Sequence, residues 1–172
     1  YIYNQRGMFN AIRNRIKHLN NIVSFDIDVY VIGCYEPWYI RWLRKTKKVS
    51  KTKCVQFDGI TYNTLWYNFT LLDYILEVKL HLTPLFTSLF YRRLLRKING
   101  YDLISAHSIN CGNLAYRVAK RDNIPFCVTW HGTDIHTTPF VNSSKFKSIS
   151  SLLKSASYNF FVSEKLRSVA AP

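Results

Sequence analysis

Glycine and proline are scarce in this sequence, which has 6 Gly and 5 Pro among its 172 residues. Long flexible linkers are rich in such residues, so the composition favours one ordinary domain over a string of tethered modules. No uncharged apolar run reaches the roughly 18 residues that a membrane-spanning helix needs. The motifs G-x-x-x-x-G-K-[ST], G-x-G-x-x-G, H-E-x-x-H and G-x-S-x-G are missing too, which argues against a phosphate loop or a hydrolase site in this stretch.

Cysteine is also infrequent, and its spacing is irregular. The sequence has 4 Cys, none of them in a C-x-x-C pair, and no regular His/Cys spacing surrounds them. We therefore expect no zinc site. Cys34, Cys54 and Cys127 lie in apolar, strand-like segments, which predicts buried free thiols in a reducing cytoplasm.

Acidic residues are the third shortage, with 10 Asp and Glu against 24 Lys and Arg and a net charge of +14. Such an excess favours an anionic partner, which is nucleic acid, an acidic membrane face or a phosphate-bearing substrate. The alternative is a proteome-wide bias toward Lys and Asn. Such residues, spread over solvated faces, would give the same net charge without any anionic partner. The net charge is informative about binding partners, but it does not indicate a fold.

Hydrophobic residues make up 48% of the chain and aromatic residues 16%, which excludes a disordered chain. Apolar residues at three- and four-residue steps predict an amphipathic helix over 8–21. A β-branched and aromatic run predicts a strand over 26–32. Residues 34–51 combine aromatic and basic residues and predict a surface loop or a short helix. A weaker strand is predicted over 54–62, with a turn or bulge at Gly59.

Apolar residues with helical spacing predict a helix over 65–82, which Pro84 ends. A second helix is predicted over 85–98, closed by Asn99 and Gly100. Strands and helices then alternate over 102–107, 113–121, 126–130, 145–155, 158–162 and 164–169. This alternation predicts an α/β fold, namely a Rossmann-like parallel sheet with helices on both faces.

In such sheets ligands bind beyond the carboxyl ends of the strands. The candidate positions are His107, Ser108, His131, Gly132, Thr133, Asp134 and Ser163, and Gly7 joins them if a strand precedes the first helix.

His131 stands where a buried strand ends, and Gly132 lets the chain turn away and lets backbone approach a ligand. Thr133 and Asp134 supply groups that bind sugar hydroxyls or orient the histidine. The alternative is a plain turn in which Asp134 caps the next segment.

The segment from Leu85 to Lys97 ends in a basic cluster made of Arg92, Arg93, Arg96 and Lys97. One interpretation is a core helix with a solvated end, whose cations suit the negative end of the helix dipole. A second is a helix on a membrane surface whose cations meet lipid phosphates. Nucleic-acid binding is the third, and nothing beyond charge supports it.

The second half of the chain resembles a known family. The resemblance rests on Tyr101–His107, Gly112–Lys120, Ile124–Ile135, Ala156 and Phe161–Arg167. In order and spacing these segments look like the amino-terminal domain of family 4 glycosyltransferases, which have the GT-B fold and transfer a sugar from a nucleotide donor with retention. Arg6–Phe9 and the helix after them resemble the family's first loop and helix. Residues 34–98 match nothing that we can name.

The resemblance implies roles for the candidate residues. His131 corresponds to a histidine that faces the transferred sugar, and its three successors correspond to neighbours in the cleft. Gly7 corresponds to a loop glycine near donor phosphate or acceptor. His107 and Ser163 correspond to positions that line the cleft. No metal or cofactor is implied, since the nucleotide-sugar is a substrate.

The resemblance also implies that residues 1–172 are one Rossmann-like, acceptor-side domain cut at both ends. The family's first strand precedes Gly7, where only residues 1–3 remain to form it, and its donor-binding domain is missing, so we expect this chain alone to be inactive.

The full-length enzyme is then expected to transfer a hexose to a glycan acceptor, including a lipid-linked one, in bacterial surface polysaccharide biosynthesis. We expect it in the cytoplasm, at the inner membrane face. A non-catalytic α/β binding module and a basic nucleic-acid-binding domain stay open as alternatives.

Overall fold

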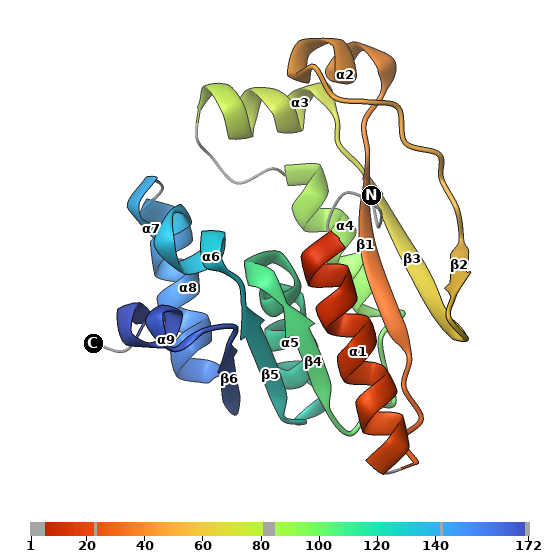
Figure 1. Cartoon of the computed structure of the whole chain (residues 1–172). Helices are drawn as coiled ribbons and strands as arrows, with labels where there is room; N and C mark the ends of the chain where they lie inside the picture. Colours follow the sequence, from red (N-terminus) through yellow and green to blue (C-terminus); the bar gives the residue numbers. More distant parts are fainter. Residues whose placement is uncertain (1–5, 23, 81–84, 142, 171–172) are drawn as a thin grey trace. The chain divides into compact units, whose positions relative to one another are not determined.

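The computed structural model describes residues 6–22, 24–80, 85–141 and 143–170. The chain divides into two compact units, Tyr1–Arg92 and Arg93–Pro172, and each is described by itself. Figure 1 labels the helices and strands of both units.

The first unit contains one three-stranded sheet and the helices around it. Its elements are α1 (Arg6–Ile22), β1 (Val29–Tyr35), α2 (Trp38–Arg44), β2 (Cys54–Phe57), β3 (Ile60–Asn68), α3 (Leu71–Tyr74), the π-helix η2 (Ile75–Lys79) and α4 (Leu85–Leu95), which continues across the boundary. The strand order is β1-β3-β2, in which β3 runs parallel to β1 and antiparallel to β2.

A tight turn joins β2 to β3. Asp58 and Gly59 both have positive φ, at 52° and 75°, and Phe57 pairs with Ile60. Positive φ at both central residues matches the right-handed twist of a hairpin, and Asp-Gly is a preferred pair for it. The turn predicted at Gly59 is therefore confirmed, and the predicted strand over 54–62 is the two arms of a hairpin.

Aromatic side chains pack this sheet. Gly33 of β1 pairs with Trp66 of β3, and a Cβ at Gly33 would lie 2.6 Å from Trp66 Cε3. The missing side chain is thus what lets the indole ring lie over β1. On α1, the ring of Phe9 lies 5.5 Å from that of Phe57 and 5.3 Å from that of buried Tyr62.

The second unit alternates strands and helices. Its elements are β4 (Ile104–His107), α5 (Ser108–Asp122), β5 (Phe126–Trp130), α6 (Gly132–His136), α7 (Thr138–Val141), α8 (Ser143–Ser155), β6 (Tyr158–Phe161) and α9 (Glu164–Ala170). The sheet order is β4-β5-β6, and both pairings are parallel. All residues of β5 are buried, as in a central strand covered on both faces.

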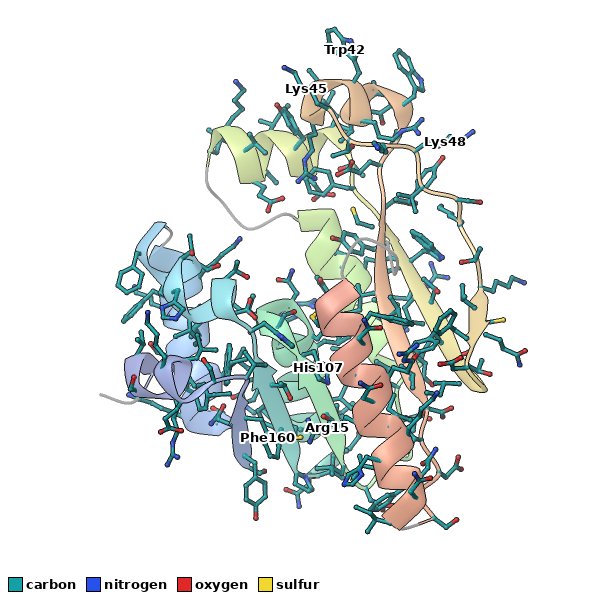
Figure 2. All side chains as sticks on the ribbon, in the orientation of Figure 1. Arg15, Trp42, Lys45, Lys48, His107 and Phe160 are labelled. Carbon is teal, nitrogen blue, oxygen red and sulfur yellow. The ribbon has the colours of Figure 1, made fainter. Side chains whose placement is uncertain are left out.

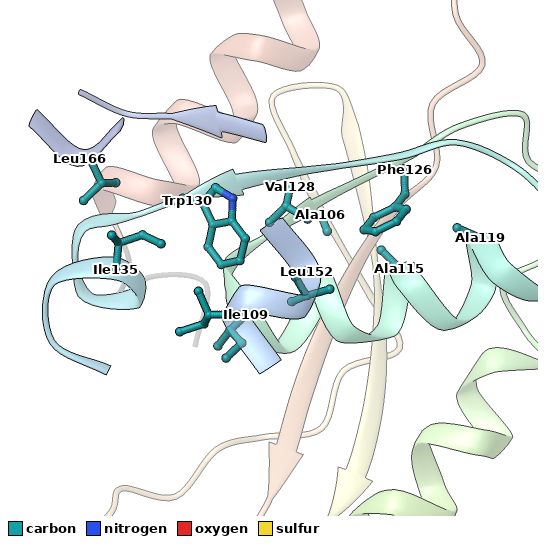
Figure 3. Packing of buried hydrophobic residues seen from close by; sticks show 11 residues of the cluster. Ala106, Ile109, Ala115, Ala119, Phe126, Val128, Trp130, Ile135, Leu152 and Leu166 are labelled. Carbon is teal, nitrogen blue, oxygen red and sulfur yellow. The ribbon is translucent and has the colours of Figure 1, made fainter. Parts of the chain in front are cut away.

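Trp130 lies at the centre of the second unit's core. Its side chain is 0% exposed and belongs to one cluster with Ile109 of α5 and Leu152 of α8 (Figure 3). The indole Nε1 donates to Asn159 Oδ1 at 2.8 Å, and Asn159 Nδ2 donates to the Leu153 carbonyl at 2.9 Å. These bonds join β5, β6 and α8, so the strand that ends at the candidate site is firmly held.

The predicted α/β class is confirmed, and the alternating elements of the second half lie close to their predicted bounds, except that α5 begins at Ser108 and not at 113. Residues 34–51 contain the short helix α2, one of the two predicted options. The second unit's sheet is parallel as predicted, whereas the first unit's sheet is mixed, because β2 runs antiparallel to β3.

Three predictions were wrong in detail. The helix predicted over 65–82 fails at its start, because β3 continues to Asn68 as a strand that pairs with β1; its end and Pro84 lie outside the described residues. The strand predicted over 26–32 is shifted to Val29–Tyr35. Of the three thiols predicted to be buried, Cys127 is buried, Cys34 is half-buried and Cys54 on the edge strand β2 is exposed; all four thiols are free as predicted.

Candidate functional site

The three parallel strands of the second unit end at one edge of their sheet. β4 ends at His107, β5 ends just before His131, and β6 ends two residues before Ser163. Because the strands are parallel, their carboxyl ends share this edge, where ligands of α/β sheets bind.

Two histidine side chains meet at this edge. His107 pairs in register with Thr129, and side chains alternate along a strand, so His107 shares a face with Thr129 and with His131. His107 Nδ1 lies 3.3 Å from His131 Nε2, and the ring centroids are 5.6 Å apart (Figure 2 labels His107). A hydrogen bond at this distance needs one proton between the two nitrogens, so the pair cannot be two imidazolium ions in this arrangement.

The backbone around His131 forms the start of a short helix. His131 is the N-cap residue of α6, with φ −107° and ψ 158°, and its carbonyl accepts from the Asp134 N–H at 3.0 Å. The segment predicted as a turn is therefore helical, and sequence analysis missed both α6 and α7. The hydrogen-bond ladder of β5 ends just before His131, and α6 then carries the chain away from the sheet.

Asp134 supports this turn from inside. Its side chain is only 7% exposed, and the backbone N–H groups of His131 and Ile109 donate to its carboxylate. Burial raises the pKa of Asp134, while those two bonds and the positive charges of His131 and Lys145 oppose the rise. Within the described residues its Oδ2 is buried without a hydrogen-bond partner. The Asp134 carboxylate thus connects the backbone at His131 to the start of α5.

His131 itself is half-buried. Burial lowers the pKa of its imidazole, and the Asp134 carboxylate offsets only part of that effect. The ring is therefore neutral near pH 7, with one nitrogen as donor and the other as acceptor.

Gly132 and Thr133 are exposed beside the histidine pair. A Cβ placed on Gly132 would meet no atom within 4 Å, so open space lies over this residue. The Thr133 carbonyl accepts from Thr138 Oγ1 at 2.9 Å, which fixes the path from α6 to α7.

Ser108 follows His107 in the left-handed region, with φ 71°. Such a conformation costs a non-glycine residue free energy, and it turns the chain sharply from β4 into α5. The Ser108 side chain hydrogen-bonds Cys111, and burial raises the pKa of that thiol despite this bond. Sequence analysis did not name Cys111 or Lys145 as site residues. Cys111 could have been found from its spacing, because it lies three residues after Ser108 in a helix.

Two candidate residues, Ser163 and Gly7, lie away from the histidine pair in sequence and have different structural roles. Ser163 caps α9, since its Oγ accepts from the Leu166 N–H at 3.3 Å, which leaves the hydroxyl proton for another acceptor. Gly7 lies in the first turn of α1 in the first unit and is exposed, and a Cβ placed on it would have no atom within 4 Å. Residues 1–3, proposed as the remnant of a first strand, lie outside the described residues.

The described residues were also searched for metal-binding clusters and for membrane-spanning helices. Among residues 6–22, 24–80, 85–141 and 143–170, no three His, Cys, Asp or Glu side chains gather in a way that could hold a metal ion. Within the same ranges, none of the helices combines the length and the apolar character needed to cross a bilayer.

A model of the family described as glycosyl transferase 4-like matches residues 63–163. This match covers more than half of the chain, so the protein belongs to that family and is a glycosyltransferase domain. A search of curated proteins returned no match.

The match extends the resemblance found in the sequence. It begins inside β3, so it includes residues 63–98, for which the sequence alone suggested no relative. It contains every candidate residue of the second unit, from His107 to Ser163, whereas Gly7 lies before it.

Proposed function

We propose that this chain is the acceptor-side domain of a retaining glycosyltransferase, which moves a hexose from a nucleotide-sugar to a glycan acceptor. His131 faces the transferred sugar, and Gly132, Thr133, His107 and Ser108 line the space around it. The contact between the two imidazoles at the carboxyl edge of a parallel sheet is the observation that carries this proposal.

The histidine pair suits a sugar hydroxyl, which donates one hydrogen bond and accepts others. When His107 Nδ1 donates to His131 Nε2, the other nitrogen of His131, Nδ1, carries a proton and donates to the ligand. When His131 Nε2 donates instead, its Nδ1 accepts. What His131 offers therefore reverses when both rings change tautomer together, by exchange of protons with solvent, and each ring is neutral in both states.

The surroundings of His131 keep its ring neutral and leave room for a ligand beside it. Burial lowers the pKa of His131, so an uncharged ring meets an uncharged sugar near pH 7. The open space over Gly132 lets a ligand approach the backbone where α6 begins. We assign His131 to positioning the sugar and its developing charge, and not to a general base.

The donor diphosphate is held elsewhere in this proposal. The sequence contains none of the glycine-rich loops that cradle phosphates. A separate donor-binding domain, outside these residues, would close over the edge and exclude water, so that the sugar passes to the acceptor hydroxyl and not to solvent.

We further propose that the acceptor is lipid-linked and that the reaction takes place at the cytoplasmic membrane face, in bacterial surface polysaccharide synthesis. The net charge of +14 supports a place beside anionic lipid. Arg92, Arg93, Arg96 and Lys97 are exposed around the end of α4, as this role requires.

Substitution of the two histidines tests the site. The variants His131→Ala and His107→Ala are compared with His136→Ala, a matched control that removes an exposed histidine from the same helix α6. The wild-type protein, with whatever domain follows it in its gene, is first screened against nucleotide-sugars. With the best donor we expect turnover to fall about 100-fold in His131→Ala, as for other groups that stabilise developing charge, and to stay unchanged in the control.

The outcomes separate the alternatives. If His131→Ala keeps wild-type turnover while circular dichroism shows an intact fold, the site assignment is wrong. If no nucleotide-sugar is turned over or bound, the non-catalytic binding module becomes the better description of this family member.

A further inference from the structure

The short helix α2 exposes an aromatic surface in the first unit. Trp38 is 73% exposed and Trp42 is 77% exposed, and Tyr39 and Leu43 beside them are exposed as well. Trp38 and Trp42 are four residues apart, so they share one side of the helix. It is unusual for two neighbouring indole rings to keep most of their surface in water, because this exposure is unfavourable in free energy. Such a surface indicates that another molecule covers it.

The helix is anchored from its other side. Ile40 is completely buried. Arg44, four residues on, pairs with Glu36 and lies 4.9 Å from the ring centre of Phe69. These contacts fix which side of α2 faces the unit, so the tryptophans are held outward by packing.

Lysines surround this aromatic surface. The basic residues of 38–53 are Arg41, Arg44, Lys45, Lys47, Lys48, Lys51 and Lys53, and residues 37–57 contain no Asp or Glu. Lys45, Lys47 and Lys48 are exposed, and the described part of the chain gives them no ion-pair partner. Figure 2 shows Trp42 with Lys45 and Lys48 around α2 and the segment that follows it.

We propose that this surface, made of Trp38, Tyr39, Trp42, Leu43, Lys45, Lys47 and Lys48, docks the protein on an anionic lipid bilayer. The two indoles enter the headgroup region, where one edge of the ring meets lipid and the N–H meets water. The three lysines stay among the lipid phosphates. This inference rests on residues 38–48 and holds whether or not the proposed acceptor is correct.

The combination of side chains selects a bilayer among anionic partners. Duplex DNA would account for the lysines, but its bases are stacked inside the helix and offer the exposed leucine and tryptophan edges no apolar medium to enter. A lipid bilayer suits both the lysines and the apolar side chains. Amphipathic segments with Trp and Leu on one side and Lys around them lie in the membrane interface.

The basic cluster at the end of α4 is the competing membrane contact. It has comparable charge in Arg92, Arg93, Arg96 and Lys97, but among the described side chains of α4 only Leu89 is an exposed large apolar residue. Charge without apolar anchors gives attraction but little insertion. We therefore assign the insertion into the bilayer to the surface around α2, while the α4 cluster adds only electrostatic attraction.

Vesicle co-sedimentation tests the proposal on the whole chain. The vesicles are phosphatidylcholine alone, or phosphatidylcholine with about 30 mol% phosphatidylglycerol, an anionic lipid. We expect binding to the anionic vesicles, weakened by salt, and much less to the neutral ones. Lys45→Gln/Lys47→Gln/Lys48→Gln should lower the partition coefficient roughly 100-fold, at about fivefold for each charge. Trp38→Ala/Trp42→Ala should lower it about tenfold or more.

Matched variants control for general charge and for exposed aromatics. Lys147→Gln/Lys154→Gln/Lys165→Gln removes the same charge from exposed positions of α8 and α9. Phe140→Ala removes an aromatic ring that is 76% exposed in the second unit. Both should bind vesicles like the wild type, and every altered side chain is exposed, so folding should be kept and is checked by thermal unfolding.

Tryptophan fluorescence shows whether the indoles enter the bilayer. Brominated phosphatidylcholine should quench the emission of the bound wild type and not that of Trp38→Ala/Trp42→Ala. The proposal is overturned if both lysine triples weaken binding equally, if the tryptophan pair is dispensable, or if removing the cations of α4 abolishes binding instead. Preference for duplex DNA over anionic vesicles, dependent on the same lysines, would overturn it in favour of nucleic acid.

Discussion

Replacing Gly132 with alanine separates the folding of α6 from the binding of a ligand beside it. The added methyl would meet no atom within 4 Å, and Gly132 has an ordinary backbone conformation that alanine can adopt. Replacing glycine under these conditions stabilises a protein by about 0.4–1 kcal/mol, because the unfolded chain loses conformational freedom. We therefore expect the thermal midpoint of Gly132→Ala to stay the same or to rise.

The same methyl should impair the reaction. If the ligand occupies the space over Gly132, the methyl overlaps it, and overpacking of one carbon costs about 1–3 kcal/mol. That cost corresponds to a decrease of roughly 5- to 150-fold in kcat/KM for sugar transfer. The assay is transfer from the nucleotide-sugar with the highest wild-type turnover, measured beside thermal unfolding of the same preparation.

Two results would refute this reasoning. Unchanged kcat/KM with an intact fold would mean that no ligand comes near Gly132. A large drop in the thermal midpoint would mean that the space over Gly132 is filled in the folded protein.

Three further predictions concern folding and protonation. Gly33→Ala should lower the free energy of unfolding by about 1–3 kcal/mol in urea titration, because its Cβ would lie 2.6 Å from Trp66; an unchanged midpoint would contradict the packing of that ring. Trp130→Phe should cost about 1–3 kcal/mol by leaving Asn159 Oδ1 without its donor, whereas a neutral result would mean that water replaces the indole. His131 should titrate below its ordinary value of 6.5 in NMR, so that its contribution to stability is intact above pH 6.5 and declines as the pH falls toward the folded pKa; a titration above 6.5 would reverse the sign.

The alternating second half of the fold was readable from sequence because its signals are local. Short β-branched strands, helix periodicity and turn residues agree with one another over residues 102–169, and the strand exit at His131 followed from the rule for α/β sheets. The start of β3 was also marked locally by Asp58 and Gly59. Its extension to Asn68 was not, because that stretch is apolar enough for either structure, and pairing with β1 decides the outcome.

The details of the site depended on contacts that sequence spacing does not report. The approach of His107 to His131 follows from the register between β4 and β5, which places two rings from separate strands on one face. The burial of Asp134 depends likewise on α5, whose Ile109 N–H meets its carboxylate. Residue type and position could be predicted here, but the direction of each side chain could not.

The exposed thiol on the edge strand β2 has a practical consequence. Cys127 is buried, and burial raises the pKa of Cys34 and Cys111, which leaves these two half-buried thiols with less thiolate than usual. Cys54 is exposed. Because the thiolate is the reactive form, a maleimide dye should modify Cys54 first. A fluorescent reporter can therefore be attached to the native sequence without engineering.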